Sequence, residues 1–239
     1  RHILLHSVID TVAGEAADNA AARQAAGSPV YLKDIPPQLQ LSAGEGEAQG
    51  VKPHSTEYWN QIFEHENPWR YDSDYEQTKY AQTLSLIGDR KPKRAIELAC
   101  AEGHFTERLA PHVESLLAVD ISQAALERAA VRCAAFDNIQ YAQLDFFTRP
   151  LPGTFDLIIC SEVLYYCRSV RQLRRVAANI AAHLADDGLL VMAHGIDASE
   201  ERDHSGFDWG GSFGTKAIGE VFSATPGLVL AEQIETELY

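Results

Sequence analysis

Apolar positions follow two spacings along this chain, one typical of buried strands and one typical of helices. Short β-rich apolar runs predict strands over residues 94–98, 115–119, 139–143, 155–160 and 188–193. Apolar residues at helical spacing predict helices between them, over residues 104–110, 122–134 and 169–184. Strands that alternate with helices indicate an α/β fold, in which helices cover both faces of a mostly parallel sheet. We therefore expect a Rossmann-like, doubly wound domain.

Two further helices are predicted before this alternation begins. Ser55 is a suitable N-cap, and the pairs Tyr58-Trp59 and Ile62-Phe63 follow it at helical spacing. Residues 74–87 repeat the pattern, which Gly88 and Pro92 end.

Residues 1–53 have a different character. Residues 10–26 are alanine-rich and predict at most a weak helix, and residues 42–50 have the small, acidic composition of a linker. We interpret 1–53 as an N-terminal extension and linker, the tail of an upstream module, and 54–239 as the folded domain. Residues 228–239 predict an incoming strand that stops abruptly, so we expect the C-terminal strand to be truncated.

The stretch from Arg94 to Thr106 carries the strongest chemical signal. An apolar run leads to Glu97, small residues follow, and a helix begins near Phe105. Such a strand, turn and helix N-terminus let the backbone approach a ligand closely. Further acids follow at or near the ends of later strands: Asp120, Asp145 and Glu162. Carboxylates accept hydrogen bonds, which suits a ribose diol and an exocyclic amine, and ligands of such sheets bind beyond the carboxyl ends of the strands.

These residues resemble the motifs of class I S-adenosylmethionine (SAM)-dependent methyltransferases. Glu97-x-Ala99-x-Ala101-x-Gly103 is similar to the first motif. The resemblance implies that Asp120 binds the ribose, that Asp145-Phe146 contacts the adenine, and that Asp156 opens the fourth motif. Alanines replace two of the usual glycines, at 99 and 101, and alanine fits there if φ stays negative.

Three other segments are most similar to the rhizobial nodulation N-methyltransferase (NodS-like) group: 67–70, 75–80 and 161–166. Enzymes of that group methylate the free amine of a de-N-acetylated chitin oligosaccharide. The resemblance also implies that the aromatic segment from Trp69 to Tyr80 forms part of a helical lid over the cofactor. Simple packing of these aromatic residues against the core is the open alternative.

The SAM-binding residues implied in this way come from the motifs, their neighbours and the lid. They are Trp69, Tyr75, Lys79, Glu97, Ala99, Ala101, Gly103, Phe105, Asp120, Ile121, Asp145, Phe146, Ser161 and Glu162. Two of these acids have a structural alternative: Asp120 can cap the helix that begins near Ser122, and Asp145 can belong to a turn.

The loop has two other interpretations. A nicotinamide dinucleotide site needs three glycines, and aligning Ala101 and Gly103 with the first two puts Thr106 at the third. That alignment leaves Glu97 without a role, so SAM is the better ligand. An α/β domain that binds no nucleotide is the other alternative.

Methyl transfer requires an aligned acceptor with a free lone pair, and a carboxylate or histidine can take the proton of an amine. Catalytic candidates near the strand ends are Glu162, Tyr165 and His194. Their structural alternatives are binding of the SAM amino group, packing and capping of a strand, respectively. The glycine-rich segment 196–213, which contains Trp209 and the acids Asp203 and Asp208, is expected to form the acceptor pocket, and a disordered surface loop is the open alternative.

Composition and charge limit the classes of partner that the chain can bind. A net charge of −14 argues against nucleic acid, and no apolar run is long enough to span a membrane. Four scattered cysteines show no metal-binding spacing and suit a reducing cytoplasm. The sequence thus predicts a SAM-dependent methyltransferase acting on an amine or hydroxyl of a small molecule, such as an amino sugar or oligosaccharide. The alternative is a non-catalytic SAM-binding module fused to an upstream enzyme.

Overall fold

The computed structural model describes residues 1–9, 52, 54–195 and 214–237. Within these ranges the chain forms a sheet of seven strands: β1 (His2–Ile9), β2 (Ala95–Leu98), β3 (Leu116–Asp120), β4 (Ile139–Gln143), β5 (Phe155–Ser161), β6 (Leu184–Gly195) and β7 (Val229–Glu237). The helices are α3 (Thr56–Ile62), α4 (Asp74–Ser85), α5 (His104–Leu109), α6 (Gln123–Arg132), α7 (Val170–His183) and α8 (Thr215–Ser223), with short 3-10 turns η3 (Ala110–His112) and η4 (Leu164–Tyr166).

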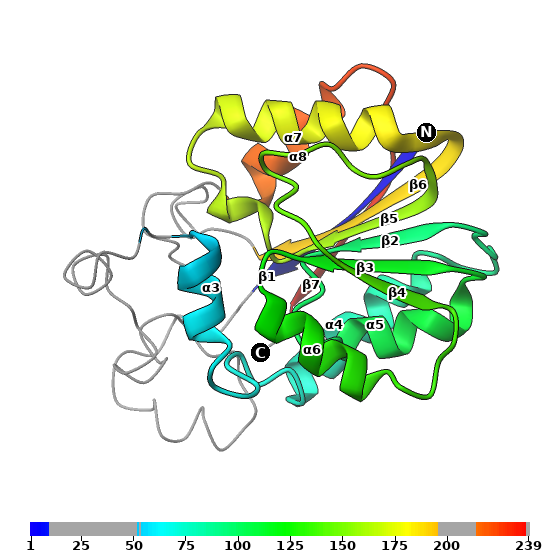
Figure 1. Cartoon of the computed structure of the whole chain (residues 1–239). Helices are drawn as coiled ribbons and strands as arrows, with labels where there is room; N and C mark the ends of the chain where they lie inside the picture. Colours follow the sequence, from blue (N-terminus) through cyan, green and yellow to red (C-terminus); the bar gives the residue numbers. More distant parts are fainter. Residues whose placement is uncertain (10–51, 53, 196–213, 238–239) are drawn as a thin grey trace.

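The order of the strands is β4-β3-β2-β5-β6-β1-β7, and the paired strands run parallel. Helices α7 and α8 cover one face of the sheet, while α4, α5 and α6 cover the other (Figure 1). The predicted Rossmann-like α/β fold is confirmed. The sheet order reverses between β2 and β5, and a crevice at such a switch point is where ligands bind in this architecture.

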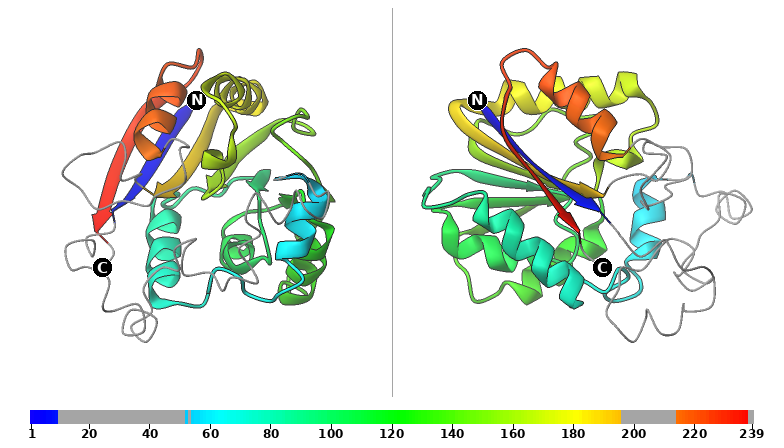
Figure 2. Two further views of the ribbon diagram at one scale, coloured as in Figure 1. Left: turned by 90° about the vertical axis from the view of Figure 1, so that its left-hand side faces the viewer. Right: turned by 180° about the vertical axis from the view of Figure 1, so that it is seen from behind.

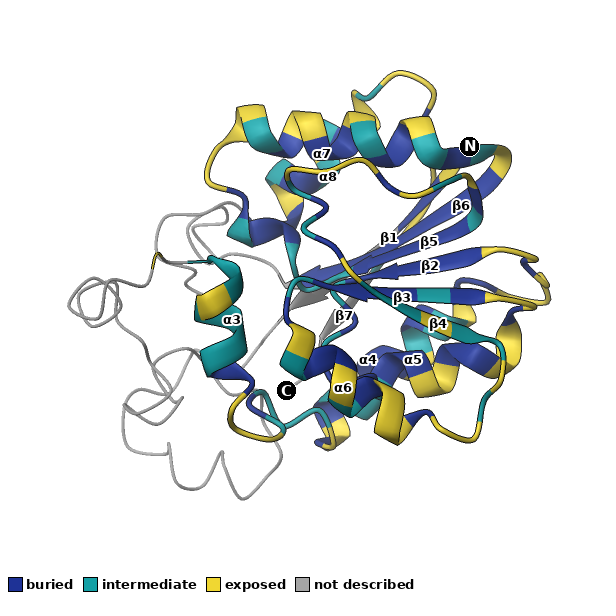
Figure 3. Ribbon diagram, in the orientation of Figure 1, coloured by how far each residue is buried: buried dark blue, intermediate teal, exposed yellow. Residues whose placement is uncertain are grey.

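Burial follows the pattern that the sequence predicted. All four residues of β2 are buried, as are most of β5, because central parallel strands have helices on both faces. The helices are buried on the side that faces the sheet and exposed on the other (Figure 3). The two larger clusters of the core lie on opposite sides of the sheet, around Ile158 and around Leu157.

The position of β1 was not predicted. Residues 2–9 lie inside the sheet between β6 and β7 and are parallel to both, so the two ends of the chain pair side by side (Figure 2). Strand β1 is therefore the neighbour of β7 in the sheet. Residues 10–51 lie outside the described residues, as does the proposed acceptor segment 196–213. The domain boundary at residue 53 stays a prediction.

Helix α3 stands beyond the carboxyl ends of the strands, whereas α4 packs beneath the sheet (Figure 1). Ser55 caps α3 as expected, since its hydroxyl accepts the backbone N–H of Tyr58. Ser73 caps α4 in the same way. Within the described ranges, none of the helices is both long and apolar enough to cross a bilayer.

Candidate active site

A cavity of about 380 Å³ lies at the carboxyl ends of β2, β3 and β5. The lid, formed by α3, the segment 63–73 and the first turns of α4, closes its other side. Most predicted site residues line it: Trp69, Tyr75, Lys79, Glu97, Ala99, Ala101, Phe105, Asp120, Ile121, Asp145, Phe146, Ser161, Glu162 and Tyr165. Gly103 and His194 are not part of this lining.

The loop after β2 has an unusual backbone. Ala99 and Ala101 have φ values of 58° and 49°, so the negative φ under which alanine fits is not what the structure contains. Left-handed alanine is strained by roughly 1–2 kcal/mol. A contact from the next strand holds the loop in place, because the carboxylate of Asp120 accepts the N–H of Ala101 at 3.0 Å. Strain that the surrounding structure maintains in this way is typical of ligand-binding sites.

Gly103 follows in the same loop, and there a glycine is required. Its φ is 81°, and a Cβ atom at this position would lie 2.9 Å from both the Cα and the Cβ of Ala129. The glycine thus allows α5 and α6 to pack closely behind the loop. Its role in the structure is one of helix packing, since it does not line the cavity.

Asp120 ends β3 and is 5% exposed. Besides the bond from Ala101, its carboxylate accepts the backbone N–H of Ser122 at 2.8 Å. A carboxylate has about four acceptor positions, so capacity for a diol remains. The capping alternative is taken by Ser122, whose hydroxyl accepts the N–H of Ala125 at the start of α6. Burial raises the pKa of Asp120 to about 6, although the backbone bonds oppose this shift.

Glu97 lies on β2, where its carboxylate accepts the hydroxyl of Thr106 at 2.7 Å. Burial raises the pKa of Glu97 to about 8, and the nearby Asp120 acts in the same direction, while the bond from Thr106 opposes them. Glu97 is therefore mostly protonated at neutral pH in the absence of a cation. A cationic ligand beside it would favour the ionised form.

Asp145 has the turn role that was its structural alternative, and its contact with the adenine stays a prediction. It lines the cavity, but it also organises a turn, because its carboxylate accepts the N–H of Phe147 at 3.0 Å and the hydroxyl of Thr148 at 2.7 Å. Phe146 is 6% exposed, and its ring meets that of Phe147 edge to face at 4.8 Å. An apolar wall with a carboxylate beside it suits a flat ring that carries an amine.

The three catalytic candidates lie in different settings. Glu162 follows β5 with a φ of 53° and faces Lys79, whose Nζ is 3.7 Å from its Oε1. Tyr165, in η4, is 2% exposed and lines the cavity. His194 is fully buried, and its Nε2 accepts the N–H of Leu164 at 3.3 Å.

Burial, with a smaller contribution from the Lys79 ammonium, lowers the pKa of His194 to about 3, so the ring is neutral at pH 7. The rings of His194 and Tyr165 meet edge to face at 5.3 Å. The structure therefore places His194 behind the turn that carries Tyr165. A neutral, buried imidazole in this position supports the turn without reaching the cavity.

Aromatic rings of the lid form one wall of the cavity. The ring of Trp59 lies 6.2 Å from that of Trp69 and 4.9 Å from that of Tyr166, and Trp69 lies 5.6 Å from Phe63. This wall joins α3 to η4, so the lid is in contact with the turn that follows β5. Of these rings, only Trp69 was among the predicted site residues.

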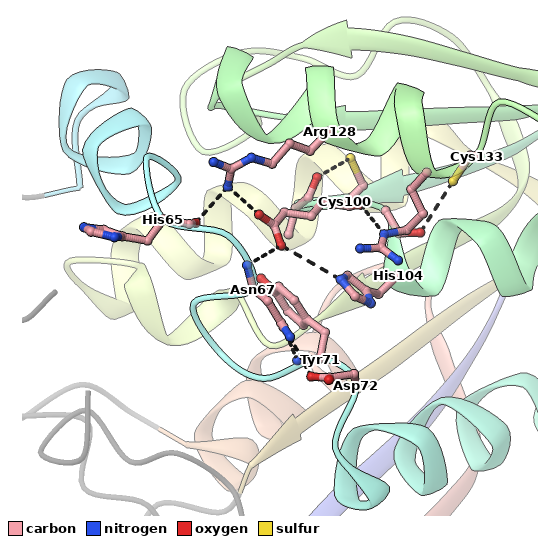
Figure 4. Close-up of polar contacts among 12 residues, drawn as sticks. His65, Asn67, Tyr71, Asp72, Cys100, His104, Arg128 and Cys133 are labelled. Atoms are coloured by element: carbon pink, nitrogen blue, oxygen red, sulfur yellow. Dashed lines mark hydrogen bonds and ion pairs between the residues drawn. The ribbon is translucent and has the colours of Figure 1, made fainter. Parts of the chain in front are cut away.

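A polar cluster that the sequence did not reveal fastens the lid. Glu102, which is 3% exposed, accepts the backbone N–H of Asn67 at 2.8 Å and pairs with Arg128 of α6. Arg128 also donates to the backbone oxygen of His65 (Figure 4) and to that of Glu64. A lone glutamate in a loop motif carries no sequence signal for this role, because its partners are distant along the chain.

The residues present fit an adenosyl ligand. Buried Asp120 and Glu97 line the cavity at neighbouring strand ends, and the small residues Ala99 and Ala101 and the ring of Phe146 line it as well. Asp120 keeps acceptor capacity for hydroxyl groups, while Glu97 has one carboxyl oxygen beyond the one bonded to Thr106.

The fold and the site together define a class I SAM-dependent methyltransferase, and SAM is its cofactor. The model of one protein family, described as Nodulation protein S (NodS), matches residues 54–237. The chain therefore belongs to the Nodulation protein S family, which confirms the methyltransferase assignment over the dinucleotide and nucleotide-free alternatives.

Curated relatives agree with this assignment. Nodulation protein S of Bradyrhizobium diazoefficiens is 34% identical over 160 residues, which cover 66% of this chain and 74% of the relative. Nodulation protein S of Rhizobium tropici is 31% identical over 191 residues, covering 79% and 77%.

Solved structures agree as well. The N-methyltransferase NodS of Bradyrhizobium japonicum WM9, in complex with S-adenosylhomocysteine, is 30% identical with a TM-score of 0.61, over 69% of this chain and 84% of that one. The DhpI complex with S-adenosylhomocysteine has a TM-score of 0.52 at 16% identity over 64% and 76%, a likeness in fold alone.

Proposed function

We propose that this chain is an N-methyltransferase whose acceptor is the amine of a small molecule, an amino sugar or a short amino-sugar oligosaccharide. The observation that supports an amine is the charge of the cavity. Its lining contains six carboxyl groups: Glu76, Glu97, Glu102, Asp120, Asp145 and Glu162. The lysine and arginine side chains of the same lining are Lys79 and Arg168.

Not all of these acids contribute a full charge. Glu102 is paired with Arg128, and the raised pKa of Glu97 keeps it mostly neutral. The remaining carboxylates still outnumber the two cations, so the cavity attracts positive charge. An amino sugar enters such a cavity as an ammonium ion, whereas a neutral alcohol gains nothing from the same field.

The chemistry then requires a proton acceptor, because an ammonium ion has no lone pair. We assign this role to Glu162: an N–H bond breaks and an O–H bond forms on its carboxylate. SAM supplies a methyl group on a sulfonium, so the freed lone pair forms the new N–C bond as the C–S bond breaks. The other residues align the acceptor and exclude water.

The sugar part of the proposal is supported by the aromatic wall of Trp59, Trp69 and Tyr166. Flat apolar faces of sugar rings pack on such side chains, with hydroxyl groups left for polar contacts. The similar solved structure is that of an N-methyltransferase, which points to the same acceptor atom. The four cysteines are free thiols, which supports a reducing, cytoplasmic location.

The test is a turnover assay with SAM and three matched acceptors, followed by mass spectrometry. The acceptors are a de-N-acetylated chitin oligosaccharide, its N-acetylated form, and the parent sugar with a hydroxyl in place of the amine. We expect methylation of the amine-bearing acceptor alone. Methylation of the hydroxyl compound would overturn the amine assignment, and SAM binding without turnover on any acceptor would favour the non-catalytic alternative.

A further inference from the structure

Lys79 of α4 is a buried cation with two acidic neighbours. Its side chain is 4% exposed, and Nζ lies 2.8 Å from Oε1 of Glu76 and 3.7 Å from Oε1 of Glu162. Glu76 is on the same helix, one turn earlier, whereas Glu162 belongs to the turn after β5. The ammonium group of Lys79 thus connects α4 to Glu162, the proposed proton acceptor.

This arrangement is costly to build. Burying an ammonium ion carries a penalty of several kcal/mol unless well-placed acids offset it. Glu162 adds a second cost, because its φ of 53° is strained for a residue with a side chain. Two costs at one contact are more easily explained by the chemistry of the cavity than by packing.

The ammonium group of Lys79 also lies near two aromatic rings and a buried histidine. Besides the two acids, its Nζ lies 5.5 Å and 5.9 Å from the ring centres of Tyr75 and Tyr80. Its charge also acts on the buried ring of His194, on β6. The titratable and charged groups around this cation are therefore Glu76, Glu162, His194, Tyr75 and Tyr80.

We propose that Lys79 is a positioning residue for Glu162, holding its carboxylate ionised and directed at the acceptor amine. This inference rests on the proposed function, in which Glu162 takes the proton of the ammonium ion. A cation within about 4 Å stabilises a carboxylate in its charged form and limits its rotation. Glu76 balances the charge of Lys79, so that it does not repel the incoming ammonium ion.

Lys79 does not act as the base itself. Burial alone would lower its pKa, but the carboxylates of Glu162 and Glu76 outweigh burial and raise the pKa above the ordinary value. The side chain therefore remains an ammonium throughout the pH range of catalysis. Its contribution passes through Glu162.

The test compares Lys79→Met, Lys79→Arg and Glu76→Gln with the wild type, using the acceptor methylated by the wild type. In Lys79→Met we expect kcat to fall about 100-fold and the acidic limb of the kcat/KM profile to move to higher pH. Binding of S-adenosylhomocysteine, measured by calorimetry, should change by less than about threefold, a small free-energy difference. Lys79→Arg should restore most of kcat, because the charge is kept.

Glu76→Gln tests the direction in which the acidic limb of the kcat/KM profile moves. It leaves Lys79 with Glu162 as its remaining carboxylate partner, so the acidic limb should move to lower pH, opposite to Lys79→Met. This comparison also serves if Lys79→Met fails to fold, which circular dichroism would reveal. If the acidic limb of the kcat/KM profile lies at the same pH as in the wild type, both in Glu76→Gln and in any folded Lys79→Met, the inference is overturned.

Loss of cofactor affinity in proportion to the loss of rate would instead make Lys79 a cofactor-binding residue and would equally overturn the inference. The proposed function fails separately, when the wild type does not methylate amines. If the wild type methylates amines and Lys79→Met matches it in rate and pH profile, the positioning role alone is wrong.

Discussion

Glu102 accepts a hydrogen bond from the backbone N–H of Asn67 at 2.8 Å, and this contact ties the loop after β2 to the lid. The same carboxylate pairs with Arg128, which in turn donates to two backbone oxygens of the lid. The cofactor loop and the cover of the cavity are therefore fastened at one buried acid. These contacts hold the lid against the loop after β2 and against α6.

Replacing Arg128 with methionine should loosen this connection. The change leaves a buried carboxylate without its cation, which we expect to lower the free energy of unfolding by about 2 kcal/mol, since the arginine is partly exposed. Cofactor affinity should fall several-fold, because two backbone oxygens of the lid lose their hydrogen bonds from Arg128. Urea denaturation and calorimetry with S-adenosylhomocysteine measure the two effects. Arg174→Met, at an exposed position of α7 on the opposite face, is the control and should change neither.

Ala101→Gly should stabilise the protein. The φ of 49° at this residue is strained for alanine, and glycine removes that strain at a small cost in the entropy of the unfolded chain. We expect a gain of about 1 kcal/mol in the free energy of unfolding. The control is Ala130→Gly, an exposed position inside α6, which should lose about 1 kcal/mol. A loss in both variants would show that the backbone of the loop is not strained.

The alternation of strands and helices could be predicted because hydrophobic spacing reports directly on local structure. The acids at the strand ends could be predicted too, because parallel strands bring their carboxyl ends to one edge of the sheet. The left-handed alanines could not, since alanine alone prefers negative φ. Their conformation depends on the Asp120 carboxylate, which comes from the next strand.

Contacts between segments that are distant along the chain could not be predicted from the sequence either. Strand β1 pairs with β6 and β7, although nothing in its composition distinguishes it from an unrelated extension. Lys79 lines the cavity, and its predicted contact with the cofactor stays a prediction, but its ion pairs with Glu76 and Glu162 were not predicted. A buried lysine on an amphipathic helix gives no indication of which acid it will meet.

The stability of the protein should depend on pH through Glu97. Its pKa is about 8 in the folded state, against an ordinary value of 4.5, so between these values the folded state binds a proton that the unfolded state has lost. The free energy of unfolding therefore falls as pH rises through this window, and Asp120, with a pKa of about 6, adds in the same direction. Glu97→Gln should flatten the decline.

Thermal melts at roughly equal intervals between pH 5 and pH 8 measure this decline in stability. The range is set by the two pKa values. The wild type should lose stability with rising pH more steeply than Glu97→Gln, and saturating S-adenosylhomocysteine should lessen the difference if its ammonium group favours the ionised acid. Parallel slopes in the two proteins would mean that Glu97 is ionised already in the folded state.

Asp120 offers the most direct test of the cofactor assignment, because a matched control exists at the other end of the sheet. Asp156 also accepts two backbone N–H groups, those of Lys93 and Arg94, but does not line the cavity. Asp120→Ala should weaken binding of SAM by roughly 2 kcal/mol or more, about 30-fold, through loss of charge-assisted hydrogen bonds. Asp156→Ala removes the same number of backbone contacts and should leave the affinity unchanged, even where stability falls. Equal affinities in both variants would show that Asp120 shapes the loop without holding the ribose.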